Sequence, residues 1–278
     1  MEARSDAEQK FQIVAVLFVI AVISISVLFF FNSYLATENN RNAVFASPLT
    51  HNYMDTSAIV NSEETVKGTD TKIEKELTCN NCMYFPVNKD NSLDKKYTPP
   101  SLISIPLLGG GMLNSEALSK LKNMFNASSK QGIAMKIVSS YRSYSDQIAT
   151  FNGWVAKEKE KGLSDKVATF NANVYSAKEG HSEHQLGTTL DLSCSNCSAF
   201  DNSFGNLKVY SFIENEAYKY GFIVSYPKGK DNLTGYKYEP WHIRYIGVDL
   251  ATELYNKGYL TNTNDYLAKF LEEKQLWQ

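Results

Sequence analysis

The first hydrophobic pattern in the chain is a continuous apolar run near its N-terminus. Residues 11–31 carry no charge, and their only polar side chains are Gln12, Ser24 and Ser26. A bilayer core of about 30 Å needs about 20 apolar residues in a helix, which this run supplies. The alternative is a cleaved signal peptide, whose apolar core would be only ~7–15 residues long. The pattern therefore predicts a single transmembrane helix after a short cytoplasmic N-terminus, residues 1–10.

The next segment, residues 32–76, has no sustained hydrophobic period. It is rich in Asn, Thr, Ser and Glu, with scattered apolar residues. Such a composition buries too little surface to offset the entropy cost of ordering the backbone. It predicts a flexible extracytoplasmic stalk, and a buried helical hairpin is the less favoured alternative. Residues 77–278 are then the folded domain.

Helical and alternating patterns are mixed along the folded domain. Short apolar runs predict strands within residues 83–87, 134–139, 190–193, 221–224 and 236–245. Helical spacing predicts helices over residues 115–127, 145–161, 207–220, 249–257 and 264–276. Gly221 stands where the third of these helices should end. This order is typical of an α+β fold, in which helices flank a small antiparallel sheet.

The charge balance of the chain excludes one class of protein. The chain has 28 Lys and Arg against 30 Asp and Glu, a formal net charge of -2. This balance lacks the basic footprint of a nucleic-acid binder. Bases near residues 11–31 are too few for the positive-inside rule to fix the orientation. The short N-terminus and the large C-terminal domain favour a single-pass protein of the cell membrane, with its domain outside the cytoplasm.

Two motifs in the folded domain concentrate polar residues. Residues 182–191 read SEHQLGTTLD and contain His184 and Asp191, and residues 239–245 read EPWHIRY and contain His242. Two imidazoles and one carboxylate form a three-ligand zinc set that leaves a fourth position for water. Such a site needs a base that is not itself a ligand, and Glu239 is the natural candidate. Alternatively, these are ordinary polar residues, a reading that the ordered pair of motifs makes less favourable.

A third block, SYRSYSDQ at residues 140–147, precedes these two motifs. Together the blocks resemble the VanY-type D-alanyl-D-alanine carboxypeptidases of the LAS metallopeptidase group. That family carries a Ser-x-His-x-x-Gly-x-x-x-Asp block and a later Glu-x-x-His block. The resemblance covers roughly residues 84–247 and implies the LAS, or hedgehog-like, peptidase fold. The predicted membrane helix, the stalk and the far C-terminus lie outside it.

The resemblance also implies roles for individual residues. His184, Asp191 and His242 would hold one catalytic Zn²⁺, and Glu239 would be the general base. Arg142 would stabilise the oxyanion of the scissile carbonyl, although a structural ion pair is its alternative role.

Three further polar residues belong to the same blocks. Gln147 and Ser182 would help to hold the substrate. His181 is either a pocket residue or a surface histidine. The sequence departs from the common family pattern at Thr189, Ser140 and Ser225, where Ala, Gly and Arg are usual. These departures remove no proposed catalytic atom.

The implied activity is removal of the C-terminal D-alanine from peptidoglycan stem peptides, by a D,D-carboxypeptidase that uses zinc-activated water. One alternative is an L,D-carboxypeptidase that acts on tetrapeptide stems with the same site. An alternative of a different class is a cell-wall-binding module without catalysis. Glu239 argues against that module, because binding alone needs no base beside the metal.

The four cysteines form two Cys-x-x-Cys pairs, Cys79 with Cys82 and Cys194 with Cys197. Outside the cytoplasm, an even number of cysteines favours disulfides. Each pair could close locally, or the two pairs could cross-link the start of the domain to the segment after Asp191. A second, structural zinc ion held by all four cysteines is the alternative.

Overall fold

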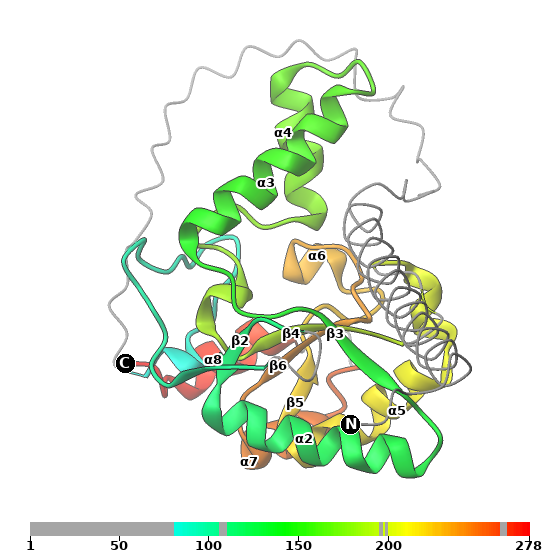
Figure 1. Ribbon diagram of the computed structural model, residues 1–278. Helices are drawn as coiled ribbons and strands as arrows, with labels where there is room; N and C mark the ends of the chain where they lie inside the picture. Colours follow the sequence, from blue (N-terminus) through cyan, green and yellow to red (C-terminus); the bar gives the residue numbers. More distant parts are fainter. Residues whose placement is uncertain (1–80, 106–109, 195–196, 198–199, 262–265) are drawn as a thin grey trace, which may run out of the picture. The chain divides into compact units, whose positions relative to one another are not determined.

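A four-stranded antiparallel sheet organises the part of the chain that the structure describes. The structure is a computed structural model, and it describes residues 81–105, 110–194, 197, 200–261 and 266–278 (Figure 1). The strand order is β3–β4–β6–β5, formed by Met135–Ser139, Thr189–Cys194, His242–Tyr245 and Phe222–Val224. A separate two-stranded sheet pairs β1 (Leu102–Ser104) with β2 (Met112–Asn114). The predicted α+β fold with a small antiparallel sheet is confirmed.

The two central strands separate an apolar face from a polar one. Their register pairs Leu190 with Ile243 and Asp191 with His242. Because successive side chains of a strand point to opposite faces, the leucine and isoleucine join the main core. The aspartate and the histidine share the other face. Alternation along β4 and β6 therefore builds the core and a polar surface at the same time.

Helices lie on both sides of the sheet. In Figure 1, α2 (Ser115–Lys130), α5 (Lys208–Glu216) and α7 (Val248–Asn256) lie below it, and α6 (Asp231–Thr234) lies above it. The hairpin of α3 (Tyr144–Lys159) and α4 (Asp165–Tyr175) projects beyond α6, and α8 (Leu267–Lys274) closes the described chain. Four 3₁₀ helices complete the described elements: η2 (Cys82–Tyr84), η4 (Glu183–Leu186), η5 (Asn202–Asn206) and η6 (Ala217–Tyr220).

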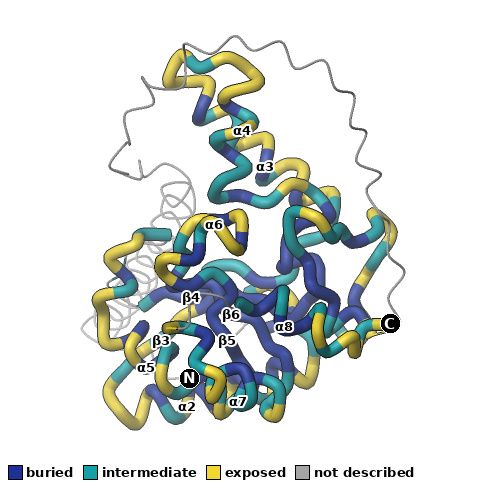
Figure 2. Tube along the Cα trace, turned by 180° about the vertical axis from the view of Figure 1, so that it is seen from behind, coloured by how far each residue is buried: buried dark blue, intermediate teal, exposed yellow. Residues whose placement is uncertain are grey.

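Helix α2 shows why the predicted pattern becomes a helix. The side chain of Asn114 caps it by accepting hydrogen bonds from the backbone N–H groups of Glu116 and Ala117. Its apolar face, which includes Leu121 and Met124, is fully buried in the main core. Figure 2 shows the sheet as a dark, buried layer and the outward side of α2 as exposed. The prediction of a helix over residues 115–127 is confirmed, with one further turn.

The α3–α4 hairpin is held together by a buried carboxylate. Glu158 on α3 accepts hydrogen bonds from Tyr175 Oη at 2.6 Å and Asn171 Nδ2 at 3.3 Å, both on α4. Lys161 in the connecting turn donates a third, at 2.6 Å. The predicted helix over residues 145–161 is confirmed as α3. Helix α4 has no counterpart among the predictions.

The predicted strand over residues 83–87 is wrong. The chain forms η2 there and continues without ladder hydrogen bonds. Pro86 has no N–H to give to a ladder. The carbonyls of Met83 and Phe85 accept hydrogen bonds from the Arg244 side chain instead. A buried side chain has taken the place of a neighbouring strand.

The remaining predicted elements are confirmed with shifted ends. The helix over residues 207–220 divides into α5 and η6, because Glu216 leaves helical geometry at φ −127°. Gly221 ends it in the left-handed region, at φ 85°. Among the described residues, no helix is both long and apolar enough to cross a membrane. The predicted membrane helix (residues 11–31) and stalk (residues 32–76) lie outside the described residues.

The cysteines that the structure describes, Cys82, Cys194 and Cys197, are in disulfides. Cys194 is bonded to Cys197, and Cys82 is disulfide-bonded as well. A cross-link from Cys194 or Cys197 to the start of the domain is therefore wrong, and so is a zinc ion held by all four cysteines. The physical reason is local: Cys194 and Cys197 are three positions apart at the end of β4, and their Cα atoms lie only 5.0 Å apart.

Replacing Leu121 by Ala should test the core beneath the sheet. The leucine is fully buried, so its loss removes apolar contacts and leaves a cavity that should cost about 2–5 kcal/mol. Urea unfolding would measure the loss. Lys122→Ala, an exposed change on the same helix, should stay within about 0.5 kcal/mol of the unmodified chain. Equal effects of both changes would contradict the assigned packing.

Candidate active site

The structure places the predicted metal ligands together on the polar face of the sheet. His184 lies in η4, and Asp191 and His242 lie opposite one another in β4 and β6. Gly187 ends η4 with φ 69° and turns the chain into β4. A Cβ at this glycine would lie 2.7 Å from Leu102 and 2.8 Å from Pro99, so the turn accepts no side chain.

The three ligand side chains converge. One ligand atom from each of His184, Asp191 and His242 lies within 4.8 Å of the other two, and all three residues are buried. His184 Nε2 lies 3.1 Å from Asp191 Oδ2, and His242 Nδ1 lies 3.0 Å from Asp191 Oδ1. The structure thus brings together three residues that are up to 58 positions apart in the sequence.

The outer nitrogens of both histidines are also engaged. His184 Nδ1 lies 2.7 Å from the carbonyl oxygen of Ser140, and His242 Nε2 lies 3.0 Å from Glu183 Oε2. Histidines that bind a metal usually donate their second N–H to a carbonyl or carboxylate, which fixes the ring orientation. Each ring therefore keeps one nitrogen aimed at Asp191 and the other tied back to the protein. This donor set fits a zinc ion.

Glu239 lies beside the three ligands. Its Oε2 is 3.6 Å from His242 Nδ1. Burial raises the pKa of this carboxyl to about 8, despite the opposing effect of His242. A carboxyl group with a pKa near neutrality can both accept and donate a proton at physiological pH. The role of Glu239 as the base stays a prediction.

Arg142 reaches the same centre from the turn after β3. Its guanidinium donates to Gln147 Oε1 at 2.7 Å and to Ser139 Oγ at 2.9 Å. Burial lowers the pKa of Arg142, and the nearby carboxylates of Asp191 and Glu239 oppose this shift. The side chain is therefore a cation held in a fixed direction close to the ligands.

In this structure, the other predicted site residues make hydrogen bonds to other groups of the protein. Gln147 accepts from Arg142 and donates from Nε2 to the carbonyl of Ala177 at 2.6 Å. Ser182 caps η4 by accepting from the backbone N–H of His184. His181 is buried, with Nδ1 2.8 Å from the carbonyl of Asn88. Substrate contacts for Gln147 and Ser182 stay predictions.

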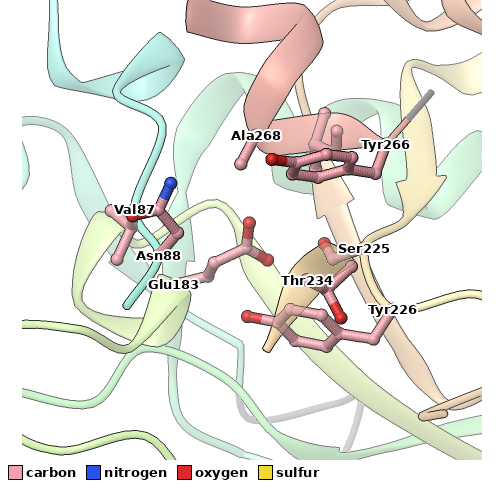
Figure 3. Close-up of a pocket in the computed structure, with 9 residues that line it drawn as sticks. Val87, Asn88, Glu183, Ser225, Tyr226, Thr234, Tyr266 and Ala268 are labelled. Atoms are coloured by element: carbon pink, nitrogen blue, oxygen red, sulfur yellow. The ribbon is translucent and has the colours of Figure 1, made fainter. Parts of the chain in front are cut away.

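The three departures from the family pattern are buried near the centre. Ser140 supplies the carbonyl that accepts from His184, and its hydroxyl accepts from the N–H of Met112 at 3.2 Å. Thr189 lies in β4, two residues before Asp191. Ser225 lines a small pocket together with Glu183 (Figure 3).

Sequence reasoning gave no role to Glu183 or Arg244. Arg244 Nη1 lies 2.9 Å from Glu183 Oε1, and the guanidinium holds the pKa of Glu183 at about 2 against the opposing effect of burial. Burial lowers the pKa of His242, but its bonds to Asp191 and Glu183 outweigh this and raise it to about 10. Period-two spacing from His242 was the available signal for Arg244.

The family model and the similar sequences both point to the same family of carboxypeptidases. The model of the VanY family, described as D-alanyl-D-alanine carboxypeptidase, matches residues 111–248. The D-alanyl-D-alanine carboxypeptidase of Enterococcus faecalis (strain ATCC 700802 / V583) is 31% identical over 212 residues, which cover 76% of this chain and 75% of that protein. The putative carboxypeptidase YodJ of Bacillus subtilis (strain 168) is 37% identical over 174 residues, covering 59% of this chain and 60% of YodJ.

Solved structures agree with the sequence matches. VanY of the VanB-type vancomycin resistance cassette, a D,D-pentapeptidase solved as a variant with Zn(II), matches with a TM-score of 0.59 and 29% identity, covering 68% of this chain and 99% of that one. VanYB with D-alanine-D-alanine gives the same score and identity. The LD-carboxypeptidase LdcB gives 0.57 and 33%, covering 67% and 84%. The chain therefore belongs to the VanY family of D-alanyl-D-alanine carboxypeptidases.

Proposed function

We propose that this protein is a zinc-dependent D,D-carboxypeptidase that removes the C-terminal D-alanine from peptidoglycan stem peptides. One observation carries the proposal: Glu239 lies 3.6 Å from His242 within a cluster of three convergent ligand side chains. A non-ligand carboxyl beside a three-ligand set is the arrangement that metal-assisted hydrolysis requires. The Zn(II) and D-alanine-D-alanine in the VanY structures support the choice of metal and substrate.

The chain's own residues divide the chemistry between them. A bound Zn²⁺ supplies Lewis acidity and lowers the pKa of a water molecule to about 7. Glu239 takes the proton from the attacking water and delivers it to the departing amine of D-alanine. Arg142 faces the negative charge that develops on the carbonyl oxygen, and Gln147 and Ser139 keep it aimed there. Asp191 and the two histidines would hold the ion in place.

Hydrolysis of an L,D bond in tetrapeptide stems is the second candidate. The observation that favours it is the match to LdcB, whose identity of 33% exceeds the 29% of the VanY structures. The same metal, base and guanidinium would serve both reactions. The stereochemistry of the residue before the terminal D-alanine distinguishes them.

The cellular location forms part of the proposal. Residues 11–31 anchor the protein in the cell membrane, residues 32–76 form a stalk, and residues 77–278 are the catalytic domain outside the cytoplasm. The disulfide between Cys194 and Cys197 supports this location, because such bonds persist in oxidising compartments. Peptidoglycan stem peptides would be accessible there.

Purified protein should release D-alanine from a stem pentapeptide, and chelation of the metal should stop the release. Zinc should restore it at about one ion per chain, since the proposal includes one catalytic site. Released D-alanine, measured against pentapeptide and tetrapeptide side by side, checks both candidates. Faster release from the tetrapeptide would favour the L,D reaction. No release from either, with zinc bound, would favour a wall-binding module.

Glu239→Gln should lower kcat by about 10²–10⁴-fold, the usual contribution of general acid–base catalysis. The amide has nearly the same shape, so zinc content should stay unchanged. Arg142→Lys keeps the charge but loses the planar fork, and kcat should fall by a smaller factor. Steady-state kinetics and metal analysis give both values. Loss of zinc in Glu239→Gln, or turnover at the normal rate, would show that the base is misassigned.

In intact cells, an external protease should release a soluble, active fragment by cutting within residues 32–76. The uncut protein should sediment with membranes and retain the sequence of residues 1–10, because an uncleaved apolar helix stays in the bilayer. Fractionation and N-terminal sequencing provide the measurement. A mature N-terminus beyond residue 31 would instead identify the apolar run as a cleaved signal peptide.

A further inference from the structure

We infer that Glu183 is a positioning residue for the metal ligand His242, and that Arg244 and the segment at residues 82–97 hold it in place. We call residues 82–97 the leading segment. The inference rests on the proposed zinc site and deepens it. The residues that the inference adds to the site neither bind the metal nor take part in proton transfer.

The argument begins with the two edges of the His242 ring. Nδ1 lies 3.0 Å from Asp191 and faces the ligand cluster, whereas Nε2 lies 3.0 Å from Glu183 Oε2. The nitrogens of an imidazole lie on different edges of the ring. Glu183 therefore contacts the edge that the metal does not use. It fixes the rotation of the ring, and its negative charge makes the ligand nitrogen a stronger donor.

A buried carboxylate needs a partner, and Arg244 provides it. Arg244 has no exposed surface, and its Nη1 lies 2.9 Å from Glu183 Oε1. Each oxygen of Glu183 thus has its own partner, one a guanidinium and the other an imidazole. Arg244 follows His242 by two positions in β6, so both side chains emerge on the same face of the sheet. Strand β6 therefore carries both the proposed ligand His242 and Arg244, the cation that holds Glu183 in place.

The other terminal nitrogen of the Arg244 guanidinium bonds to the leading segment. Nη2 donates to the carbonyl of Met83 at 3.0 Å and to that of Phe85 at 2.7 Å. These carbonyls have no strand partner, as described above. The guanidinium is therefore fixed from two sides, by Glu183 and by backbone carbonyls outside the sheet.

The leading segment also holds the loop that carries His184. The backbone N–H of Leu93 donates to the carbonyl of Gly180 at 2.8 Å. Gln185 Nε2 donates to the carbonyl of Asp94 at 2.9 Å. Residues 82–97 therefore support both histidine ligands, although they precede the part of the chain that matches the family model, residues 111–248.

Figure 3 shows the surroundings of the Glu183 carboxylate. Asn88 of the leading segment, Ser225, Tyr226 and Tyr266 line the same small pocket. The Tyr226 ring packs 4.8 Å from the His242 ring, centroid to centroid. The tyrosine blocks movement of the imidazole out of the plane set by Glu183, so ring contact and hydrogen bond restrain the same ligand.

The test is zinc affinity in the full chain, measured by competition with a chelating dye. Glu183→Gln keeps the shape of the side chain but removes its charge, and should weaken zinc binding by about 10–100-fold. Glu158→Gln is the matched control: this glutamate is also buried with three hydrogen-bond partners, but it lies in the α3–α4 hairpin. Its zinc affinity should equal that of the unmodified chain.

Glu183→Gln also leaves Arg244 buried without its charge partner, which destabilises the fold. A double variant, Glu183→Leu with Arg244→Met, removes both charges and keeps the volume apolar. It should fold, and it should show the same weakened zinc affinity. The visible spectrum of the Co²⁺-loaded chain adds a readout of ligand geometry. It should change in both Glu183 variants and stay unchanged in Glu158→Gln.

Zinc affinity and a Co²⁺ spectrum equal to those of the unmodified chain, in either folded Glu183 variant, would overturn the inference. In that case the proposed function would survive if His242→Ala still abolished zinc binding. If the unmodified chain bound no zinc, the proposed function itself would fail and the inference with it. A loss of affinity as large in Glu158→Gln as in Glu183→Gln would also overturn it, because the effect would then be general destabilisation.

Discussion

The pairing of β4 with β6 is the constraint on which the domain depends. Its register sets Leu190 against Ile243 in the core and Asp191 against His242 on the opposite face. A shift by one residue would turn every side chain of one strand to the other side, burying the carboxylate in the core and breaking the ligand set. Core packing and ligand geometry therefore select the same register. The burial that stabilises the fold also fixes the centre to which the chemistry is assigned.

Charge in a buried place needs compensation, and this site is built from charges that compensate one another. Asp191 lies between two imidazoles, and Glu183 lies between an imidazole and the Arg244 guanidinium. Each of these groups would be costly to bury alone. Glu239 is the exception, because burial raises its pKa to about 8 and outweighs the opposing effects of His242 and Arg142. The group left without full compensation is the one assigned to move a proton.

Local pattern and tertiary contact contributed differently to what could be predicted. Helix α2 and strands β3 to β6 follow from apolar spacing, because their buried faces repeat at the periods of helix and strand. Helix α4 was missed because few of its apolar side chains are buried: Ala168 and Ala172 are, whereas Phe170 is 72% exposed. The helix is secured through Glu158 on another element. The apolar run at residues 83–87 predicted a strand, but Pro86 and Arg244 decide otherwise.

By itself, the sequence determined the fold class and singled out His184, Asp191 and His242 as candidate metal ligands and Glu239 as the candidate base, because ordered motifs and residue chemistry are properties of the chain alone. Tertiary structure alone decided which nitrogen of each histidine faces Asp191, that Cys194 pairs with Cys197, and that Gln147 holds Arg142. It also decided that Met83 and Phe85 reach the site through Arg244, 159 or more positions later in the chain. The reason is physical: a buried polar group pairs with whichever group the fold brings next to it. The spacing of residues along the sequence does not show which groups those are.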